Sequence, residues 1–322
     1  MEIFRFEKTA NMVASRILKI KKGERVLIIT DTDRPRTITE ALAYSASSYG
    51  GELIIIIMKP QNVGGEEPPA PVAAAMKEAE VIINQATFSL THTQATRDAL
   101  KKGARIANLR NLDEEMFLTG GVSANYDRVR ELSEKLADIL TNINKIRLTT
   151  PEGTDLIMYA KSRKGIAQTG FATKPGQFSG LPDGEATIAP LEGQSEGVIK
   201  NPYIADIIGV IDEPLELIVK NGRIGEITGG KQADTLKRLI KERDENANAV
   251  ASQFAMGTNP GCRIIPNTRE VSKKLGTAHI AIGDNLSLYG KMNSNMHIDF
   301  VFLKPTIFFD DKCIMRNGEL KL

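Results

Sequence analysis

The chain contains few of the residues that most directly indicate a function. Its 322 residues include two cysteines, three histidines and no tryptophan. Cys262 and Cys313 are too few for a disulfide framework and lack zinc-finger spacing, which favours a reducing, cytoplasmic location. The net charge of +2 is close to balance, so the composition gives no support for nucleic acid or an anionic membrane as a partner.

Long apolar stretches are absent as well. The first eight residues contain no apolar signal core, and the longest purely apolar run, Leu53 to Met58, is far too short to span a bilayer. Neither G-x-G-x-x-G nor G-x-x-x-x-G-K-[ST] follows the first expected strand, which removes the usual support for nucleotide binding. A hydrophobic content of 41% and a charged content of 25% are those of an ordinary soluble protein, and the length suggests two domains.

The first half of the chain alternates short buried strands with helices. Continuous apolar, β-branched runs predict strands at 25–30, 53–58, 81–83 and 105–109. Helices are expected between these strands, which predicts an open, mostly parallel α/β sheet. A strongly amphipathic helix at 125–142 closes this half, so the α/β domain is expected to comprise residues 1–143.

The second half has shorter strands and more turns. One hairpin is expected from 145–149 and 155–159, and another from 215–220 and 223–228. The second hairpin contains Asn221-Gly222, the favoured pair for a two-residue turn. Residues 144–322 are therefore predicted to form a separate α+β, strand-rich domain.

Two of the three histidines lie close together near the C-terminus. His279 follows Gly276-Thr277-Ala278, and His297 stands two residues before Asp299. In a strand, this spacing puts His297 and Asp299 on one face and Ile298 on the other. Two imidazoles and a carboxylate are the smallest set for an open divalent metal site. The pattern favours a metal-dependent enzyme, with hydrogen-bonded core groups as the alternative.

Three further residues are candidates for the chemistry. Glu185 is a lone acid in an apolar, turn-rich segment and is expected to complete or assist the metal site. His92 is expected where the third strand meets a helix, at the edge of an open sheet where ligands collect, although the sequence alone favours a surface position beside a helix cap. Tyr289 lies between the two histidine segments, where it either approaches the metal or a substrate oxygen or packs.

Several segments, taken in order, resemble one known group of proteins. They are Ser89-Leu90-Thr91-His92-Thr93, Leu181-Pro182-Asp183-Gly184-Glu185, Glu192-Gly193 to Gly197-Val198-Ile199, Val219-Lys220-Asn221-Gly222, Gly257-Thr258-Asn259-Pro260, Gly276-Thr277-Ala278-His279-Ile280-Ala281-Ile282-Gly283 and His297-Ile298-Asp299. Together they resemble the thermophilic metalloaminopeptidases (aminopeptidase T and aminopeptidase S) and the related 2,5-dihydroxypyridine 5,6-dioxygenases over nearly the whole chain. The resemblance implies a homodimer and a metal site in the second domain.

For the aminopeptidases, the resemblance implies two divalent metals (zinc, cobalt or manganese) held by two glutamates, two histidines, an aspartate and a tyrosine. Carried over by motif, the matching residues are Glu185, His279, His297, Asp299 and Tyr289. The second glutamate is the departure, because the family has Glu four residues before the Gly of Gly-Thr-Asn and this chain has Gln253 there. A neutral amide holds a second hard cation poorly.

The dioxygenase relatives imply a single Fe(II) held by two histidines and an aspartate. His279, His297 and Asp299 satisfy that set, and His92 is the remaining histidine for acid–base work. The leading hypothesis is a hydrolase that releases N-terminal residues from small peptides through a metal-activated water, with Glu185 accepting the proton. The alternatives are a ring-cleaving dioxygenase acting on a small aromatic substrate, and a catalytically silent relative that serves as a binding or assembly module.

Overall fold

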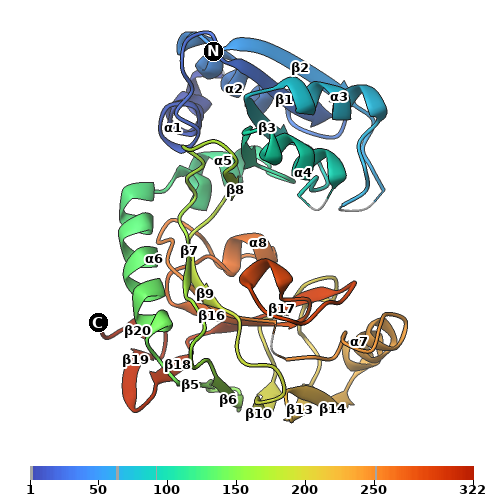
Figure 1. Cartoon of the computed structure of the whole chain (residues 1–322). Helices are drawn as coiled ribbons and strands as arrows, with labels where there is room; N and C mark the ends of the chain where they lie inside the picture. The colour runs from blue at the N-terminus through green and yellow to red at the C-terminus, as the bar shows by residue number, and fades with distance from the viewer. Residues whose placement is uncertain (1–2, 63–64, 92, 251) are drawn as a thin grey trace. The chain divides into compact units, whose positions relative to one another are not determined.

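The computed structural model describes residues 3–62, 65–91, 93–250 and 252–322. Within these residues the chain divides into two compact units. Unit 1 comprises residues 1–126 and 169–183, and unit 2 comprises residues 127–168 and 184–322. The elements of both units are labelled in Figure 1.

Unit 1 contains the parallel sheet expected from the alternating pattern. Its five strands, which we call sheet A, run in the order β2-β1-β3-β4-β8, and every neighbouring pair is parallel. The strands are β1 (Arg25–Asp31), β2 (Glu52–Met58), β3 (Val81–Gln85), β4 (Arg105–Asn108) and β8 (Phe178–Gly180). The helices are η1 (Ile3–Phe6), α1 (Glu7–Met12), η2 (Val13–Ile17), α2 (Arg36–Ser48), α3 (Ala70–Glu78), α4 (Gln94–Lys101), α5 (Glu114–Thr119) and η3 (Gly121–Ser123).

The helices of unit 1 begin and end at residues that the sequence indicates. Pro35 precedes α2, and Gly50 follows it with a φ of 80°, a conformation that glycine adopts without strain. The Thr93 side chain accepts a hydrogen bond from the Thr96 N–H at 3.1 Å and caps α4. Strand β1 is buried at every position after Arg25, as a central parallel strand requires.

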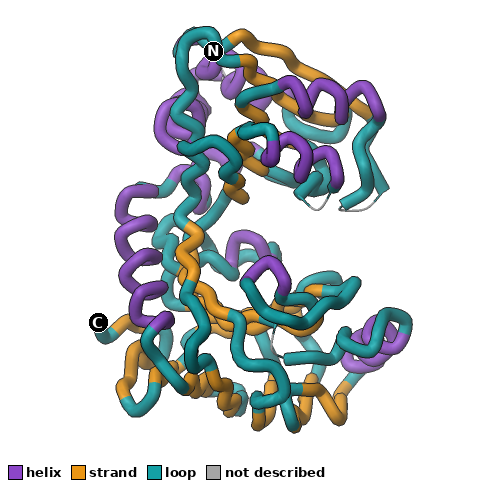
Figure 2. Tube along the Cα trace, in the orientation of Figure 1, coloured by secondary structure: helices purple, strands orange, loops and turns teal. Residues whose placement is uncertain are grey.

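Unit 2 is dominated by two antiparallel sheets (Figure 2). Sheet B has the order β14-β13-β10-β6-β5-β18-β19-β20, and sheet C has the order β12-β11-β17-β16-β15-β9-β7. The strands of sheet B are β5 (Lys145–Thr149), β6 (Asp155–Tyr159), β10 (Glu196–Lys200), β13 (Leu215–Lys220), β14 (Arg223–Gly229), β18 (Thr306–Phe309), β19 (Lys312–Arg316) and β20 (Glu319–Leu320). Those of sheet C are β7 (Ile166–Gln168), β9 (Glu185–Ile188), β11 (Ile204–Ala205), β12 (Gly209–Val210), β15 (Gln253–Gly257), β16 (Thr277–Gly283) and β17 (His297–Leu303). The helices are α6 (Tyr126–Thr141), α7 (Lys231–Lys241), α8 (Thr268–Val271) and η4 (Leu286–Leu288).

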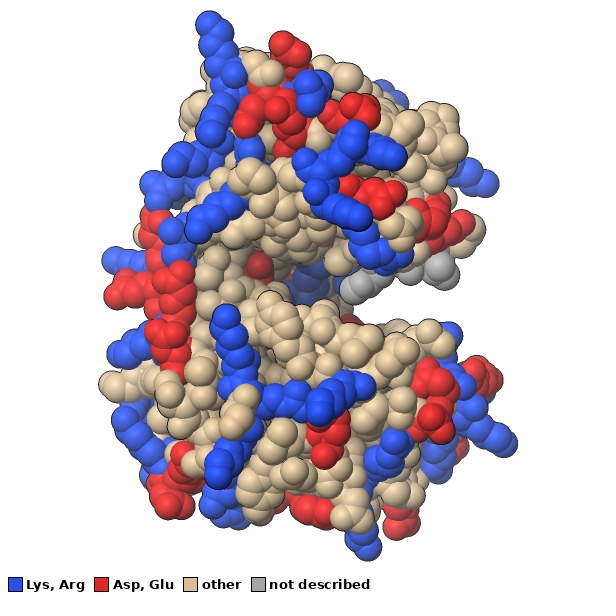
Figure 3. All heavy atoms as spheres, viewed as in Figure 1, with Lys and Arg blue, Asp and Glu red and all other residues tan. Residues whose placement is uncertain are grey.

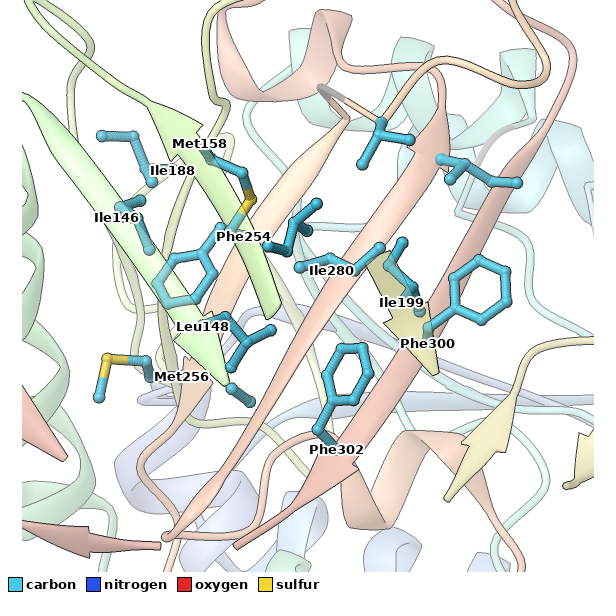
Figure 4. Packing of buried hydrophobic residues seen from close by; sticks show 14 of the residues in the cluster. Ile146, Leu148, Met158, Ile188, Ile199, Phe254, Met256, Ile280, Phe300 and Phe302 are labelled. Carbon is cyan, nitrogen blue, oxygen red and sulfur yellow. The ribbon is translucent and has the colours of Figure 1, made fainter. Parts of the chain in front are cut away.

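The main core of unit 2 contains residues from the facing strands of both sheets. Sheet C contributes Phe254, Ile280 and Phe300, and sheet B contributes Ile146 and Leu148, all fully buried (Figure 4). Burying apolar surface of this kind contributes roughly 1.5–3 kcal/mol for each large side chain. One face of sheet C is therefore committed to the core, so its polar side chains must lie on the other face.

The two units differ in two places from the expected division at 143/144. Helix α6 belongs almost entirely to unit 2, because its buried residues Leu136 and Leu140 join the same core cluster as Ile146. The segment 169–183 returns to unit 1, because β8 adds to the edge of sheet A beside β4. A strand of three residues has too little pattern to be recognised in a sequence.

Surface and length features agree with the composition. Both signs of charge are interspersed over the face drawn in Figure 3. Among the described residues, no helix combines the length and apolarity that crossing a bilayer requires. The expected hairpin around Asn221-Gly222 is confirmed as β13 and β14, with positive φ at both turn residues.

Candidate metal centre

The polar residues of the site project from one face of sheet C. In the antiparallel register, Ala281 of β16 pairs with Gln253 of β15 on one side and with Asp299 of β17 on the other. His279 lies two residues before Ala281, and Glu185 pairs with Gly257 two positions beyond Ala255. Residues directly opposite each other share a face, and so do alternate residues along a strand. The five expected metal-site residues that lie in sheet C, Glu185, Gln253, His279, His297 and Asp299, therefore lie on the face opposite the core.

Small residues alternate with the polar ones on this face. Ala255 and Ala281 are fully buried and carry only a methyl group, and Gly257 carries none. The intervening positions, such as Ile280 and Phe254, point into the core. The strands therefore pack apolar side chains on one face and carry small residues between the polar ones on the other, where the backbone of Lys274 approaches Gly257 closely.

The first half of the site is a buried cluster around Glu185, whose side chain has no exposed surface. The amide of Gln253 donates a hydrogen bond to Oε1 of Glu185 at 3.0 Å, and the ammonium of Lys273 donates to Oε2. Nε2 of His279 lies 3.4 Å from Oε2 of Glu185 and 3.2 Å from Nε2 of Gln253. Both carboxylate oxygens of Glu185 thus accept hydrogen bonds from side chains of the protein.

The second half of the site is the pair formed by His297 and Asp299. Nε2 of His297 lies 3.3 Å from Oδ1 of Asp299. On the other side of the ring, Nδ1 lies 2.9 Å from the backbone carbonyl of Asp284. This contact orients the imidazole with Nε2 toward Asp299, which is how a metal-binding histidine is commonly held. The His297 side chain keeps 36% of its surface exposed, so a ligand from solution can reach it.

Charge couples the two halves. Burial by itself would raise the pKa of the Asp299 carboxyl, but the positive charges of His279, His297 and Lys273 hold it well below its ordinary value. For His297, burial lowers the pKa, while the hydrogen bond to Asp299, the charge of Asp299 and the carbonyl of Asp284 raise it to about 9. The carboxylate of Asp299 is therefore ionised and within electrostatic reach of both imidazoles.

The donor types and the spacing within each pair fit a divalent cation. Two atoms bound to one cation at about 2.1 Å lie roughly 3.0–3.4 Å apart at octahedral or tetrahedral angles. The separations of 3.3 Å in the His297–Asp299 pair and 3.4 Å in the His279–Glu185 pair are of this size. Nδ1 of His279 is also buried without a hydrogen-bond partner among the described residues. Within the same residues, no group of three His, Cys, Asp or Glu side chains is arranged to hold a metal, so the donors stand as two pairs.

A polar network anchors the loop between β16 and β17, which leads into His297. The Glu192 carboxylate accepts hydrogen bonds from the Asn285 amide at 3.0 Å and from the Lys291 N–H at 2.9 Å, and it also pairs with Arg163. Burial alone would raise the pKa of Glu192, but these backbone and side-chain donors lower it. The loop is therefore tied to the body of unit 2 on the side from which His297 enters its strand.

One of the expected site residues, Tyr289, is not joined to this cluster. Tyr289 ends η4 with a φ of 61° and has 73% of its surface exposed; its backbone carbonyl accepts a hydrogen bond from Arg163 at 3.1 Å. His92 lies outside the described residues, so its expected role stays a prediction. Lys273 was not among the expected residues, because a lysine in Val271-Ser272-Lys273-Lys274 carries no sequence signal that separates it from a surface lysine.

Known proteins that match this chain belong to the two groups that its motifs resemble. A family model described as 2,5-dihydroxypyridine 5,6-dioxygenase matches residues 14–322. A 2,5-dihydroxypyridine 5,6-dioxygenase of Pseudomonas putida is 22% identical over 259 residues, which is 76% of this chain and 72% of that protein. The solved structure of the dioxygenase from Pseudomonas putida KT2440 matches with a TM-score of 0.79 and 17% identity, over 98% of this chain and 96% of that one. Wild-type AmpT from Thermus thermophilus matches with a TM-score of 0.74 and 17% identity, over 99% of each chain.

These comparisons confirm both resemblances and the fold class. At 17% identity, the two structural matches show a shared fold rather than a shared reaction. The family model and the relative matched by sequence both carry the dioxygenase name.

Proposed function

Because the chain belongs to the 2,5-dihydroxypyridine 5,6-dioxygenase family, we propose that it is an Fe(II)-dependent dioxygenase that opens the ring of a small hydroxylated aromatic compound. The proposed iron ligands are His279 from the first pair and His297 and Asp299 from the second, which would draw together around the ion. When bound to such a set of two histidines and one carboxylate, Fe(II) keeps open positions for a chelating substrate and O2. The proposal reverses the order of the hypotheses drawn from the sequence, in which the aminopeptidase stood first.

One observation carries the proposal beyond family membership. Both oxygens of Glu185 already accept hydrogen bonds, from the Gln253 amide and the Lys273 ammonium. A dinuclear peptidase centre would need this carboxylate for a cation or for accepting a proton from water. With Glu185 engaged and Gln253 neutral, the remaining anionic donor beside the histidines is Asp299, which supports a centre for one metal.

Other residues of the chain orient the proposed ligands and hold their strands in place. The Asp284 carbonyl holds the His297 ring with Nε2 toward Asp299, which fixes the donor atom before any ligand arrives. The apolar core on the reverse side of sheet C keeps the donor strands in register. Ala281, between Gln253 and Asp299 on the same face, places only a methyl group there.

The aminopeptidase hypothesis rests on the fold shared with AmpT. Its peptide-hydrolysing activity is unconfirmed, and the neighbours of Glu185 weigh against it. A silent relative, the third hypothesis, would retain the fold without turnover. The homodimer implied by the resemblance also stays a proposal, which light scattering on the purified chain tests directly.

The decisive experiment loads the purified protein with Fe(II) under anaerobic conditions and adds 2,5-dihydroxypyridine and O2. A dioxygenase places both oxygen atoms in its product without an external reductant, so O2 uptake and loss of ring absorbance should proceed in equal amounts. A parallel assay follows release of p-nitroaniline from leucine p-nitroanilide by the Zn, Co and Mn forms. Peptide-type hydrolysis without O2 uptake, or no turnover with any metal and either substrate, would overturn the proposal.

Site variants sharpen this test. Asp299→Asn keeps the shape of the side chain and removes its charge, so we expect it to abolish O2 uptake. Asp155→Asn is the matched control, since Asp155 lies in sheet B and pairs with Arg147. Equal loss in both variants would point to damage of the fold rather than of the metal centre.

A further inference from the structure

Lys273 is held beside the candidate metal centre by the backbone around it. It lies between α8 and β16, and only 15% of its side chain is exposed. Its carbonyl accepts a hydrogen bond from the Asn259 N–H at 2.9 Å, and the carbonyl of Asn259 accepts one from the Leu275 N–H at 2.9 Å. These two bonds fasten the lysine segment to the turn that follows β15. The ammonium therefore reaches Glu185 from a built position rather than from a mobile surface chain.

Because Glu185 is fully buried, the negative charge of its carboxylate needs a compensating group nearby. An ionised carboxylate with no exposed surface is costly unless a positive group or hydrogen-bond donors compensate it. Here Lys273 supplies a full positive charge on Oε2, and Gln253 supplies a neutral donor on Oε1. In a two-metal centre of the kind that the aminopeptidase resemblance implies, a second metal ion would supply that compensation.

We propose that Lys273 acts as a fixed internal cation, whose ammonium takes the place of a second metal ion at Glu185 and limits the centre to a single divalent ion. This inference rests on the metal centre of the proposed function, but not on the ring-opening reaction. It assigns a role to a residue outside the ligand set, and it explains how a buried glutamate persists beside a glutamine.

The position of the ammonium at Glu185 supports the same role. It lies on Oε2 of the carboxylate, whose other oxygen accepts the hydrogen bond from the Gln253 amide. A second divalent cation at Glu185 would meet this positive charge at close range. A unit charge a few ångströms away changes the affinity for a cation by more than about tenfold.

Mn²⁺ binding to metal-free protein tests the inference. We would compare wild type, Gln253→Glu, Lys273→Met and the double variant, measuring bound Mn²⁺ by elemental analysis after equilibrium dialysis. Electron paramagnetic resonance distinguishes an isolated Mn²⁺ from a coupled pair. We expect wild type and Gln253→Glu to bind one ion per chain, and the double variant to bind two, with the spectrum of a coupled pair.

Matched variants separate the charge of Lys273 from its effect on folding. Lys273→Arg keeps the charge and should keep one ion, and Lys274→Met removes the neighbouring half-buried lysine and should behave as wild type. If Lys273→Met fails to fold because Glu185 loses its partner, Glu185→Gln combined with Lys273→Met removes both charges. That pair variant should fold and bind one ion.

Two results would overturn the inference. One is a second Mn²⁺ bound by wild type or by Gln253→Glu, because Lys273 would then not exclude it. The other is a folded double variant that still binds one ion. If metal counts follow the expectation but no ring opening is seen, the proposed reaction fails and the role of Lys273 stands. If ring opening is seen while the counts do not depend on Lys273, only the inference fails.

Discussion

Two neighbouring residues of β16 allow the two faces of sheet C to be perturbed separately. Ala281 lies between Gln253 and Asp299 on the site face, and the adjacent Ile280 lies in the core on the reverse face. Both are fully buried. We predict that Ala281→Val weakens metal binding, whereas Ile280→Val lowers stability and leaves metal binding unchanged.

The expected magnitudes follow from the two environments. Adding two methyl groups at a fully buried alanine strains its surroundings by about 1–3 kcal/mol. If the metal-bound form bears that strain, affinity falls by roughly five- to 150-fold. Ile280→Val removes one methylene between Phe254 and Phe300 and should cost about 0.5–1.5 kcal/mol. That cost corresponds to a decrease in Tm of roughly 1–6 °C for a unit of this size.

Titration of metal-free protein with Mn²⁺ gives the affinity, and thermal unfolding of the same samples gives the Tm. Ala281→Val should change the affinity for Mn²⁺, and Ile280→Val should change only the Tm. Wild-type affinity in Ala281→Val, or an equal loss of affinity in Ile280→Val, would refute the assignment of opposite faces to metal binding and to packing.

Other predictions concern contacts that stabilise each of the two units. Gly257→Ala would place a Cβ 2.1 Å from the carbonyl oxygen of Lys274, so it should destabilise the protein by about 1–3 kcal/mol in urea unfolding, and wild-type stability would contradict this contact. Glu24→Gln leaves the largely buried Arg105 without its bidentate partner and should cost about 3–5 kcal/mol at pH 7; a loss below about 1 kcal/mol would contradict a buried pair. Burial raises the pKa of Glu24, but hydrogen bonds from Arg105 and the Lys21 N–H lower it overall, so its contribution to stability is complete above about pH 4.3 and is lost as pH falls through the lower folded-state value. The difference in unfolding free energy between wild type and Glu24→Gln should therefore shrink toward pH 3, and a constant difference would show that the charge of Glu24 is not the cause.

Much of the fold could be predicted from local pattern. The alternation of β-branched runs and helices predicted the parallel strands of sheet A. The Asn221-Gly222 turn predicted the hairpin of β13 and β14 in sheet B. These features depend on residues close in sequence, where periodicity and turn chemistry act directly. Strand β8 and the membership of α6 depend on contacts with distant segments, which no local pattern contains.

The site shows the same division between local and distant information. The shared face of His297 and Asp299 follows from their spacing of two, and the structure confirms the strand that this requires. The approach of Lys273 to Glu185 joins residues 88 positions apart, so the sequence offered no reason to connect them. Tyr289 was chosen for its place between two histidines, yet it is exposed and in a left-handed backbone conformation.

Side chains of β16 point alternately to the metal site and to the core, and this alternation limits where related chains can differ in length. Inserting or deleting a single residue within this strand would move every following side chain to the opposite face of sheet C. The metal-site residues would then point into the hydrophobic core, and the isoleucines would point to the site face. Changes in length are therefore tolerable only outside the strand, in the connection that spans residues 284–296. When homologous sequences are aligned, gaps should collect in that connection, while the residues from Thr277 to Gly283 keep an unbroken count.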